Sequence, residues 1–140
     1  MISYIRTPEL DSKVLPASTV RLVDGSSYAL RKGKPLLIHF WATWCPTCKL
    51  EAANIERVSQ KYEVLTIAVN SGSDEKIRHF LQEKGLHYRV LNDKNGEWAK
   101  RFRVEAFPTT FIYNTQGILK FTETGYTTTA GLLARMALAE

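Results

Sequence analysis

The chain has 140 residues, of which 44% are hydrophobic and 24% charged, and its net charge is +5. These are the proportions of one globular domain with a sizeable core, and they argue against intrinsic disorder. The basic residues are spread along the chain, and the two densest groups, residues 31–34 and 100–103, hold three each, which is too few for a nucleic-acid-binding surface.

The N-terminal residues 1–17 contain Pro8 and Pro16 without sustained periodicity, so we expect them to form an extended lead-in. A single domain of residues 18–140 is expected to follow. The first ten residues lack the basic-then-apolar pattern of a secretory signal, and no apolar stretch approaches the ~20 residues that span a bilayer. Taken literally, this indicates a soluble, monomeric cytosolic protein. The alternative is a chain from which an upstream signal or membrane anchor has been removed.

The rest of the chain is predicted to alternate between strands and helices. Two short β-type runs, Thr19–Val23 and Ser27–Leu30, flank the turn dipeptide Asp24-Gly25 and predict a hairpin. Five further strands are expected at residues 36–41, 63–69, 88–91, 109–113 and 118–122. Helices are expected at residues 46–62, 74–84, 97–102 and from 128 or 129 onward. This order predicts an α/β fold in which a mixed sheet with a parallel core carries helices on both faces and ends in an antiparallel hairpin.

The most informative stretch is Leu36–Glu51, where an apolar strand runs into Trp44-Cys-Pro-Thr-Cys48. With Cys45 as the N-cap, Pro46 takes the first helical position, which its fixed φ and missing N–H suit. Cys48 then lies one turn further along the same face, within reach of a disulfide with Cys45. The unpaired amides and the positive dipole end of the first turn favour a thiolate at Cys45. Cys45 is therefore the candidate nucleophile, and Cys48 the candidate resolving thiol.

The sequence contains no other cysteine, so the pair is available for reversible exchange rather than for a disulfide framework. Exchange needs no cofactor, only protein thiol or disulfide substrates and a partner that resets the redox state of the pair. A metal-binding module is the alternative, since two thiolates suit Cu(I). A structural zinc site would need two further ligands, and His39, His79 and His87 lack paired ligand spacing. We therefore expect no resident metal.

With the Cys-x-x-Cys motif after a strand and Phe107-Pro108-Thr109 before a late strand, the chain resembles thioredoxin-fold proteins. The resemblance covers the chain from about residue 19 to the end. The hairpin in front and the helix-strand insert at residues 73–91 are similar to the extracytoplasmic TlpA/ResA/DsbE branch. The nearest likeness is to the ScsD-type disulfide oxidoreductases, a group associated with bacterial copper tolerance. It rests on four segments: Phe40-Trp-Ala-Thr-Trp-Cys45, Leu91-Asn-Asp93, Pro108-Thr-Thr-Phe111 and Gly125-Tyr-Thr-Thr128.

This resemblance implies a thioredoxin-like thiol-disulfide oxidoreductase acting on proteins, with reduction as the favoured direction. It also implies a periplasmic domain that an N-terminal helix tethers to the inner membrane, and a membrane electron transporter as a candidate resetting partner. Cu(I) binding by the reduced pair stays open as an alternative. So does thiol reduction in cytochrome c maturation, although Thr109 stands where that group usually has an acidic residue.

Several site residues follow from the resemblance. Pro108 matches the cis-proline beside the active-site disulfide, where the neighbouring backbone receives a substrate strand. Glu51 matches an acidic residue near the buried thiol, although on sequence alone a glutamate there points as readily to solvent. His39 stands six residues before Cys45, where thioredoxins carry a buried aspartate. It is expected either to relay a proton near neutral pH or to be a hydrogen-bonded core residue.

The residues that border the cysteine pair are the candidate substrate contacts: Trp44, Pro46, Thr47, Phe107 and Pro108. Trp41, on the strand itself, is expected in the core.

Overall fold

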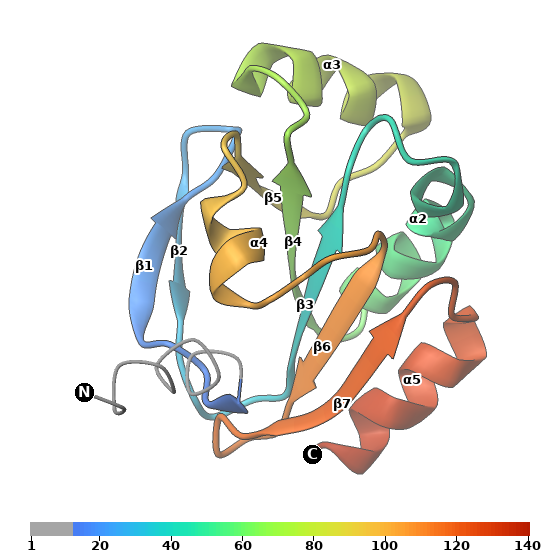
Figure 1. Ribbon diagram of the computed structural model, residues 1–140. Coiled ribbons are helices and arrows are strands. Elements are labelled where there is room, and N and C mark those ends of the chain that lie inside the picture. Colours follow the sequence, from blue (N-terminus) through green and yellow to red (C-terminus); the bar gives the residue numbers. More distant parts are fainter. Residues whose placement is uncertain (1–12) are drawn as a thin grey trace.

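The computed structural model describes residues 13–140, and Figure 1 shows a central sheet with helices on either side. The expected lead-in over residues 1–17 therefore lies mostly outside the described residues. Near its end, Val14 forms an isolated antiparallel bridge with Ile118, and the Leu15 amide donates to the Gly117 carbonyl at 2.8 Å. The chain thus enters the fold beside the turn between its last two strands.

The main sheet has five strands in the order β5-β4-β3-β6-β7. Their bounds are Leu36–Trp41 for β3, Glu63–Val69 for β4, Arg89–Asp93 for β5, Thr109–Tyr113 for β6 and Leu119–Thr124 for β7. β3, β4 and β5 run parallel, whereas β6 is antiparallel to β3, and β7 to β6. The register of the last pair shifts between Ile112 and Tyr113, which leaves Lys120 as a bulged residue on the edge strand. The predicted mixed sheet with a parallel core and a final antiparallel hairpin is confirmed.

Helices cover both faces of this sheet, as predicted. α2 (Pro46–Ser59), α3 (Asp74–Lys84) and α5 (Thr129–Leu138) pack on one face, and α4 (Glu97–Arg101) packs on the other. A separate two-stranded sheet, β1 (Ser18–Arg21) with β2 (Ser27–Leu30), joins α4 on that second face. Within residues 13–140, none of the helices has the length and apolar character needed to cross a bilayer.

Strand β3 lies in the middle of the sheet, and all six of its side chains are buried. Because successive side chains of a strand point to opposite faces, Leu37 and Trp41 join the core under α2, while Ile38 and Phe40 join the core under α4. Burial on both faces explains why the sequence of β3 is a nearly continuous apolar run. The polar exception is His39, which shares the α2 face of the sheet with Leu37 and Trp41.

Strand β5 begins one residue later than expected, and it extends two residues further at its carboxyl end. Asn92 and Asp93 lie beyond the expected strand of residues 88–91, yet they pair in register with the end of β4. The buried Asp93 carboxylate accepts hydrogen bonds from the amides of Trp98 and Ala99 at 3.0 and 2.9 Å. Its charge is thereby placed at the first turn of α4, where the helix dipole favours an anion, and a polar residue becomes compatible with the strand.

Helix α2 ends at Ser59 instead of continuing to the expected Tyr62. The Gln60 amide donates back to the Arg57 carbonyl at 3.2 Å, and the amides of Lys61 and Tyr62 both donate to the Val58 carbonyl. The chain therefore leaves the helix through a tight turn that leads directly into β4.

The aromatic cluster under α4 offers a test of this packing. Phe40 is fully buried, and its ring centroid lies 5.3 Å from that of Phe102 and 5.7 Å from that of Phe111. Phe40→Ala should lower the free energy of unfolding by about 3–5 kcal/mol, because it removes apolar contacts and leaves a cavity. Urea unfolding of the oxidised protein measures this loss, and Leu138→Ala, at a side chain that is 73% exposed, is the control with almost no effect. A decrease of less than about 1 kcal/mol in the free energy of unfolding of Phe40→Ala would contradict the assignment of this ring to the core.

Candidate active site

The two cysteines lie where β3 passes into α2, at the carboxyl end of the central strand. Cys45 is the N-cap of α2, with extended backbone angles, and Pro46 occupies the first turn, as the sequence predicts. The Cys48 amide donates a hydrogen bond to Cys45 Sγ at 3.2 Å. A sulfur that accepts an amide hydrogen bond at a helix start is stabilised as a thiolate once the pair is reduced.

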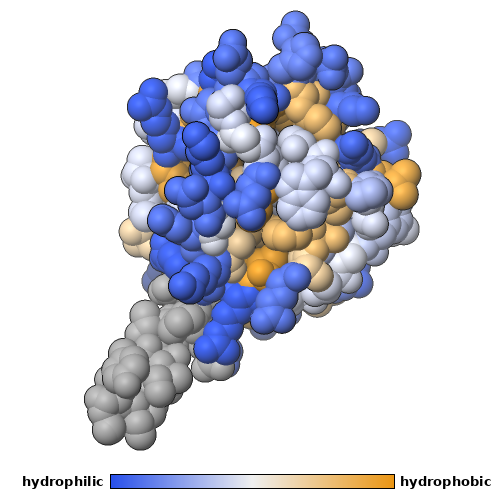
Figure 2. All heavy atoms as spheres, turned by 45° about the horizontal axis from the view of Figure 1, so that its top comes forward, coloured by the Kyte–Doolittle hydropathy of each residue, from blue (hydrophilic) through white to orange (hydrophobic). Residues whose placement is uncertain are grey.

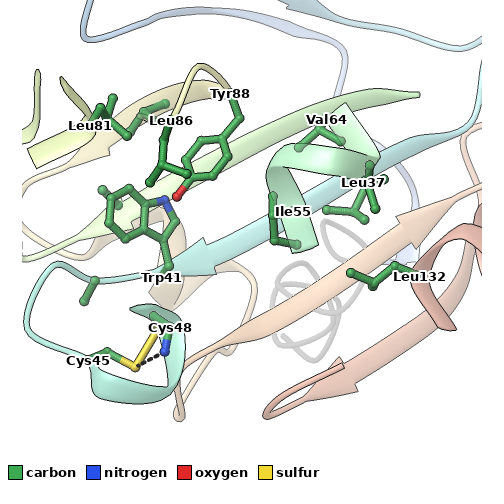
Figure 3. Packing of buried hydrophobic residues seen from close by; sticks show 14 of the residues in the cluster. Leu37, Trp41, Cys45, Cys48, Ile55, Val64, Leu81, Leu86, Tyr88 and Leu132 are labelled. Carbon is green, nitrogen blue, oxygen red and sulfur yellow. Dashed lines mark hydrogen bonds between the residues drawn. A yellow bond between two sulfur atoms is a disulfide. The ribbon is translucent and has the colours of Figure 1, made fainter. Parts of the chain in front are cut away.

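Cys45 and Cys48 form a disulfide with a Cα–Cα distance of 5.2 Å. Both side chains are buried, at 6% and 3% exposure, and Figure 3 shows them at the near end of α2, beside Trp41. Trp41 is 2% exposed and lies against Phe80 and Tyr88, so its expected place in the core is confirmed. The disulfide therefore belongs to the hydrophobic core under α2. Its other side faces the loops at the carboxyl end of β3.

The loop before β6 brings Phe107 and Pro108 to the disulfide. The peptide bond between these two residues is cis, the conformation that the resemblance implies. The Phe107 carbonyl oxygen lies 3.7 Å from Cys45 Sγ. The structure thus brings Pro108, which lies far from the two cysteines in the sequence, to the Cys45–Cys48 pair, where the resemblance places it.

An aromatic border flanks the disulfide on one side. Trp44 is 55% exposed, and its ring packs edge-on against Phe107 with centroids 5.7 Å apart. Its indole N–H donates to the Asn70 carbonyl at 2.9 Å, which fixes the direction of the ring. Pro46 is exposed and Thr47 is half-buried on the helix beside it. Asn70, which has a left-handed φ of 48°, gave no sign in the sequence of supporting this border.

The surface at this end of the molecule carries apolar areas. Figure 2 brings the top of the Figure 1 view forward and shows hydrophobic (orange) atoms between hydrophilic (blue) and pale side chains. Leu50 on α2 is 73% exposed, and Tyr126, in the loop between β7 and α5, is 52% exposed. Apolar side chains are thus open to a partner both on the Trp44 side and along α2.

Glu51 lies one turn after Cys48 on the same face of α2, and it is completely buried. Within the part of the chain that the structure describes, neither of the Glu51 carboxylate oxygens has a partner at full hydrogen-bond geometry. Burial raises the pKa of Glu51 from 4.5 to about 7, against a smaller opposing influence of the Thr127 backbone amide. Of the two orientations left open by the sequence, the structure shows the inward one.

His39 is buried on the sheet face that α2 covers. Its Nδ1 lies 2.8 Å from the Thr110 hydroxyl on the neighbouring strand β6, so the imidazole has a polar partner. Burial lowers the pKa of His39 to about 3, because a charged ring would lose its hydration. His39 is therefore neutral near pH 7, and its role in proton relay stays a prediction.

The loop between β7 and α5 contributes contacts that the sequence did not reveal. The Gly125 amide donates to the Pro108 carbonyl at 2.8 Å. The side-chain amide of Asn54, on α2, donates to the Tyr126 hydroxyl and to the Thr127 carbonyl, both at 3.0 Å. A single asparagine in a helix is usually a solvent-facing residue, so its sequence position gave no reason to include Asn54 in the site.

No metal centre is formed by the part of the chain that the structure describes. Within residues 13–140, no three or more histidine, cysteine, aspartate or glutamate side chains are grouped so that they could hold a metal ion.

Comparisons with known proteins match almost the whole chain. A family model described as Redoxin matches residues 10–135. A thioredoxin-like protein of Haemophilus influenzae is 27% identical over 100% of this chain and 85% of its own length. The thiol:disulfide interchange protein DsbE of Pasteurella multocida is 31% identical over 83% of this chain and 67% of its own. The crystal structure of the exposed lipoprotein thioredoxin of Streptococcus pneumoniae has a TM-score of 0.75 and 25% identity, over 88% of this chain and 99% of that one.

Glu51→Gln should change how stability depends on pH. A carboxyl whose pKa is raised in the folded protein contributes stability that is complete below about pH 4.5 and is lost as the pH rises through about 7. Between pH 4 and pH 8 the unmodified protein should therefore lose about 3 kcal/mol relative to Glu51→Gln, at about 1.4 kcal/mol per pKa unit. Urea unfolding of both oxidised proteins across this range measures the difference. Parallel pH curves would show that the carboxyl titrates normally.

Proposed function

The chain belongs to the Redoxin family, in its thioredoxin-like TlpA/ResA/DsbE branch, and from this premise we propose that it exchanges disulfides with proteins through a mixed disulfide at Cys45. It is a thiol-disulfide oxidoreductase, like its relatives in that branch. The observation that carries the proposal is the hydrogen bond from the Cys48 amide to Cys45 Sγ at the start of α2. That contact selects Cys45 as the sulfur best able to bear a negative charge.

The exchange balances within the cysteine pair and the substrate. The Cys45 thiolate attacks one sulfur of a substrate disulfide, so a new S–S bond forms while the substrate bond breaks and releases a thiolate. Cys48, as a thiolate, then attacks the Cys45 sulfur, which restores the Cys45–Cys48 disulfide and frees the second substrate thiol. Two electrons pass from the cysteine pair to the substrate. A separate thiol reductant must then supply two further electrons, which reduce the Cys45–Cys48 disulfide again.

Glu51 is our candidate acceptor for the proton that Cys48 loses in the second step. Support comes from its position one turn after Cys48 on the same helix face, its burial and its pKa of about 7. A general base works best when its pKa lies near the working pH, because it can then both take and release a proton. A carboxyl with an ordinary pKa would hold a proton too weakly at neutral pH.

The cis Phe107–Pro108 bond and the aromatic border offer a place for the substrate. Pro108 is buried and the Phe107 ring is half-buried, so a substrate chain would meet the backbone and the rings of Phe107 and Trp44 next to Cys45. Pro46 and Thr47 complete this edge from the helix side. An extended segment lying there would carry its own sulfur to the nucleophile in a defined orientation.

The finer assignments rest on sequence likeness. The ScsD-type subgroup and a role in copper tolerance are proposed on the likeness of four segments, at residues 40–45, 91–93, 108–111 and 125–128. Action as a reductase, and an extracytoplasmic location with a membrane tether, are proposed on the same likeness. The location has further support from the exposed lipoprotein thioredoxin, whose structure resembles this one.

Trapping tests the exchange itself. Cys48→Ser removes the resolving thiol, so the reduced variant should accumulate mixed disulfides through Cys45 with an oxidised protein substrate such as insulin. Non-reducing electrophoresis and mass spectrometry would detect the adducts. Cys45→Ser is the matched control, and it should form at least tenfold less adduct because the buried Cys48 lacks the helix-start position. Absence of adducts, together with no insulin reduction by the unmodified protein, would overturn the proposal.

A separate test concerns His39. If the imidazole relays a proton, His39→Ala should slow insulin reduction by about 100-fold, the lower end of general acid-base contributions, and should shift its pH profile. Thr110→Val is the matched control, because it removes the hydroxyl beside Nδ1 but keeps the imidazole. Circular dichroism would check that both variants fold. Unchanged kinetics in a folded His39→Ala variant would assign the residue to the core.

A further inference from the structure

One asparagine on α2 holds a loop next to the buried carboxyl of the candidate site. The loop spans residues 125–128, between the end of β7 and the start of α5. Asn54 is 9% exposed on α2 and uses its side-chain amide group twice, toward the Tyr126 hydroxyl and the Thr127 carbonyl, at 3.0 Å each. The amide of an asparagine has two N–H donors, so both are engaged on this loop.

Asn54 and Glu51 belong to the same stripe of the helix. Residues three apart on an α-helix are neighbours on one face, and Cys48, Glu51 and Asn54 follow that spacing. All three are buried, at 3%, 0% and 9% exposure. The loop reaches Glu51 as well, since the Thr127 backbone amide is the polar group that acts on its carboxyl. Asn54 therefore holds the same residue, Thr127, whose backbone amide lies near the Glu51 carboxyl.

We propose that Asn54 is a positioning residue, which fastens the loop of residues 125–128 to α2 and so shields the Glu51 carboxyl from water. Its meaning for catalysis rests on the proposed function, in which Glu51 accepts the proton of Cys48. An unpartnered carboxyl is costly to ionise in a dry site and inexpensive to ionise in water. By holding the loop in place, Asn54 keeps water away from Glu51 and thereby raises the pKa of its carboxyl.

The surrounding charges do not offer an alternative cause for the behaviour of Glu51. On α2 the neighbouring titratable group is Cys48, which is held in the disulfide. His39 on β3 is neutral near pH 7, so it places no charge beside Glu51. The Tyr126 hydroxyl in the loop accepts a hydrogen bond from Asn54. Glu123 on β7 and Arg135 on α5 pair with each other at 2.8 Å. Burial is the largest influence on the Glu51 pKa, and we assign part of that burial to the loop.

The test compares Asn54→Ala with a variant that loses equivalent hydrogen bonds elsewhere. Asn92 also donates two side-chain hydrogen bonds, to the Gly72 carbonyl and to the Asp74 carboxylate, and it holds the segment between β4 and α3. Asn92→Ala is thus a matched control that loosens a loop away from Glu51. Each variant is made with and without Glu51→Gln, and the pH midpoint of the stability difference within each pair reports the Glu51 pKa.

We expect Asn54→Ala to lower this midpoint by at least one pH unit from about 7, a tenfold or greater loss of proton affinity. Asn92→Ala should leave it unchanged, and Tyr126→Phe, which removes one of the two hydrogen bonds, should give a smaller shift. Equal midpoints in the Asn54→Ala and Asn92→Ala pairs would overturn the proposal. Should Asn54→Ala not fold, Tyr126→Ala takes its place, and a midpoint that stays at about 7 overturns the proposal equally.

These measurements use the oxidised protein without substrate, so they separate the two proposals. If the exchange function is wrong, the midpoints still report whether Asn54 controls Glu51. If the exchange function is right and Asn54 has no such role, mixed disulfides still form while the midpoint does not move. When both hold, the pH profile of insulin reduction by Asn54→Ala shifts to lower pH together with the midpoint.

Discussion

The hydrogen bond from the Cys48 amide to the Cys45 sulfur is the contact on which the candidate site depends. It exists because Cys45 is the N-cap of α2, and α2 begins at Pro46, whose fixed φ suits the first turn of a helix. Strand β3, which is buried on both faces, ends at Trp41 and places this helix start at the carboxyl end of the sheet. The first turn of the helix supplies an amide that no carbonyl can satisfy, and the sulfur takes that place. The sheet, the helix start and the reactivity of the cysteine are therefore parts of one arrangement.

The second half of the site follows the opposite physical rule. Cys45 is favoured in its charged form by the unpaired amides at the start of α2. Glu51 is withdrawn from water, which favours its neutral form. Both groups lie on the same helix within two turns. An ionised nucleophile and a carboxyl that is only partly ionised near pH 7 can therefore coexist at short range. The charge repulsion between them is weaker than between two full anions, and the ionised fraction of Glu51 can still accept a proton.

The sequence predicted the parts of this arrangement that depend on local pattern. The order of the elements, the helix start at Cys45 and the buried Trp41 follow from periodicity and capping, while the cis bond at Pro108 was expected from the resemblance. Residues whose role depends on a distant partner could not be found in this way. The role of Asn54 depends on its hydrogen bond to Thr127, and the place of Asp93 at the end of a strand depends on the amides at the start of α4. Glu51 could be placed near the thiol only by resemblance, because the burial of a helix residue depends on what packs against the helix in three dimensions.

The bulged edge strand has a consequence for a protein of a family that exchanges disulfides with other proteins. β7 is an edge of the main sheet, and alternate residues along it are exposed. A flat edge of this kind would add any extended polypeptide as a further strand and begin aggregation, but a bulge and a lysine make such pairing unfavourable. Lys120 provides both, because it is the bulged residue itself. Extended polypeptides can thus bind near the site without pairing to β7 as a further strand of the sheet.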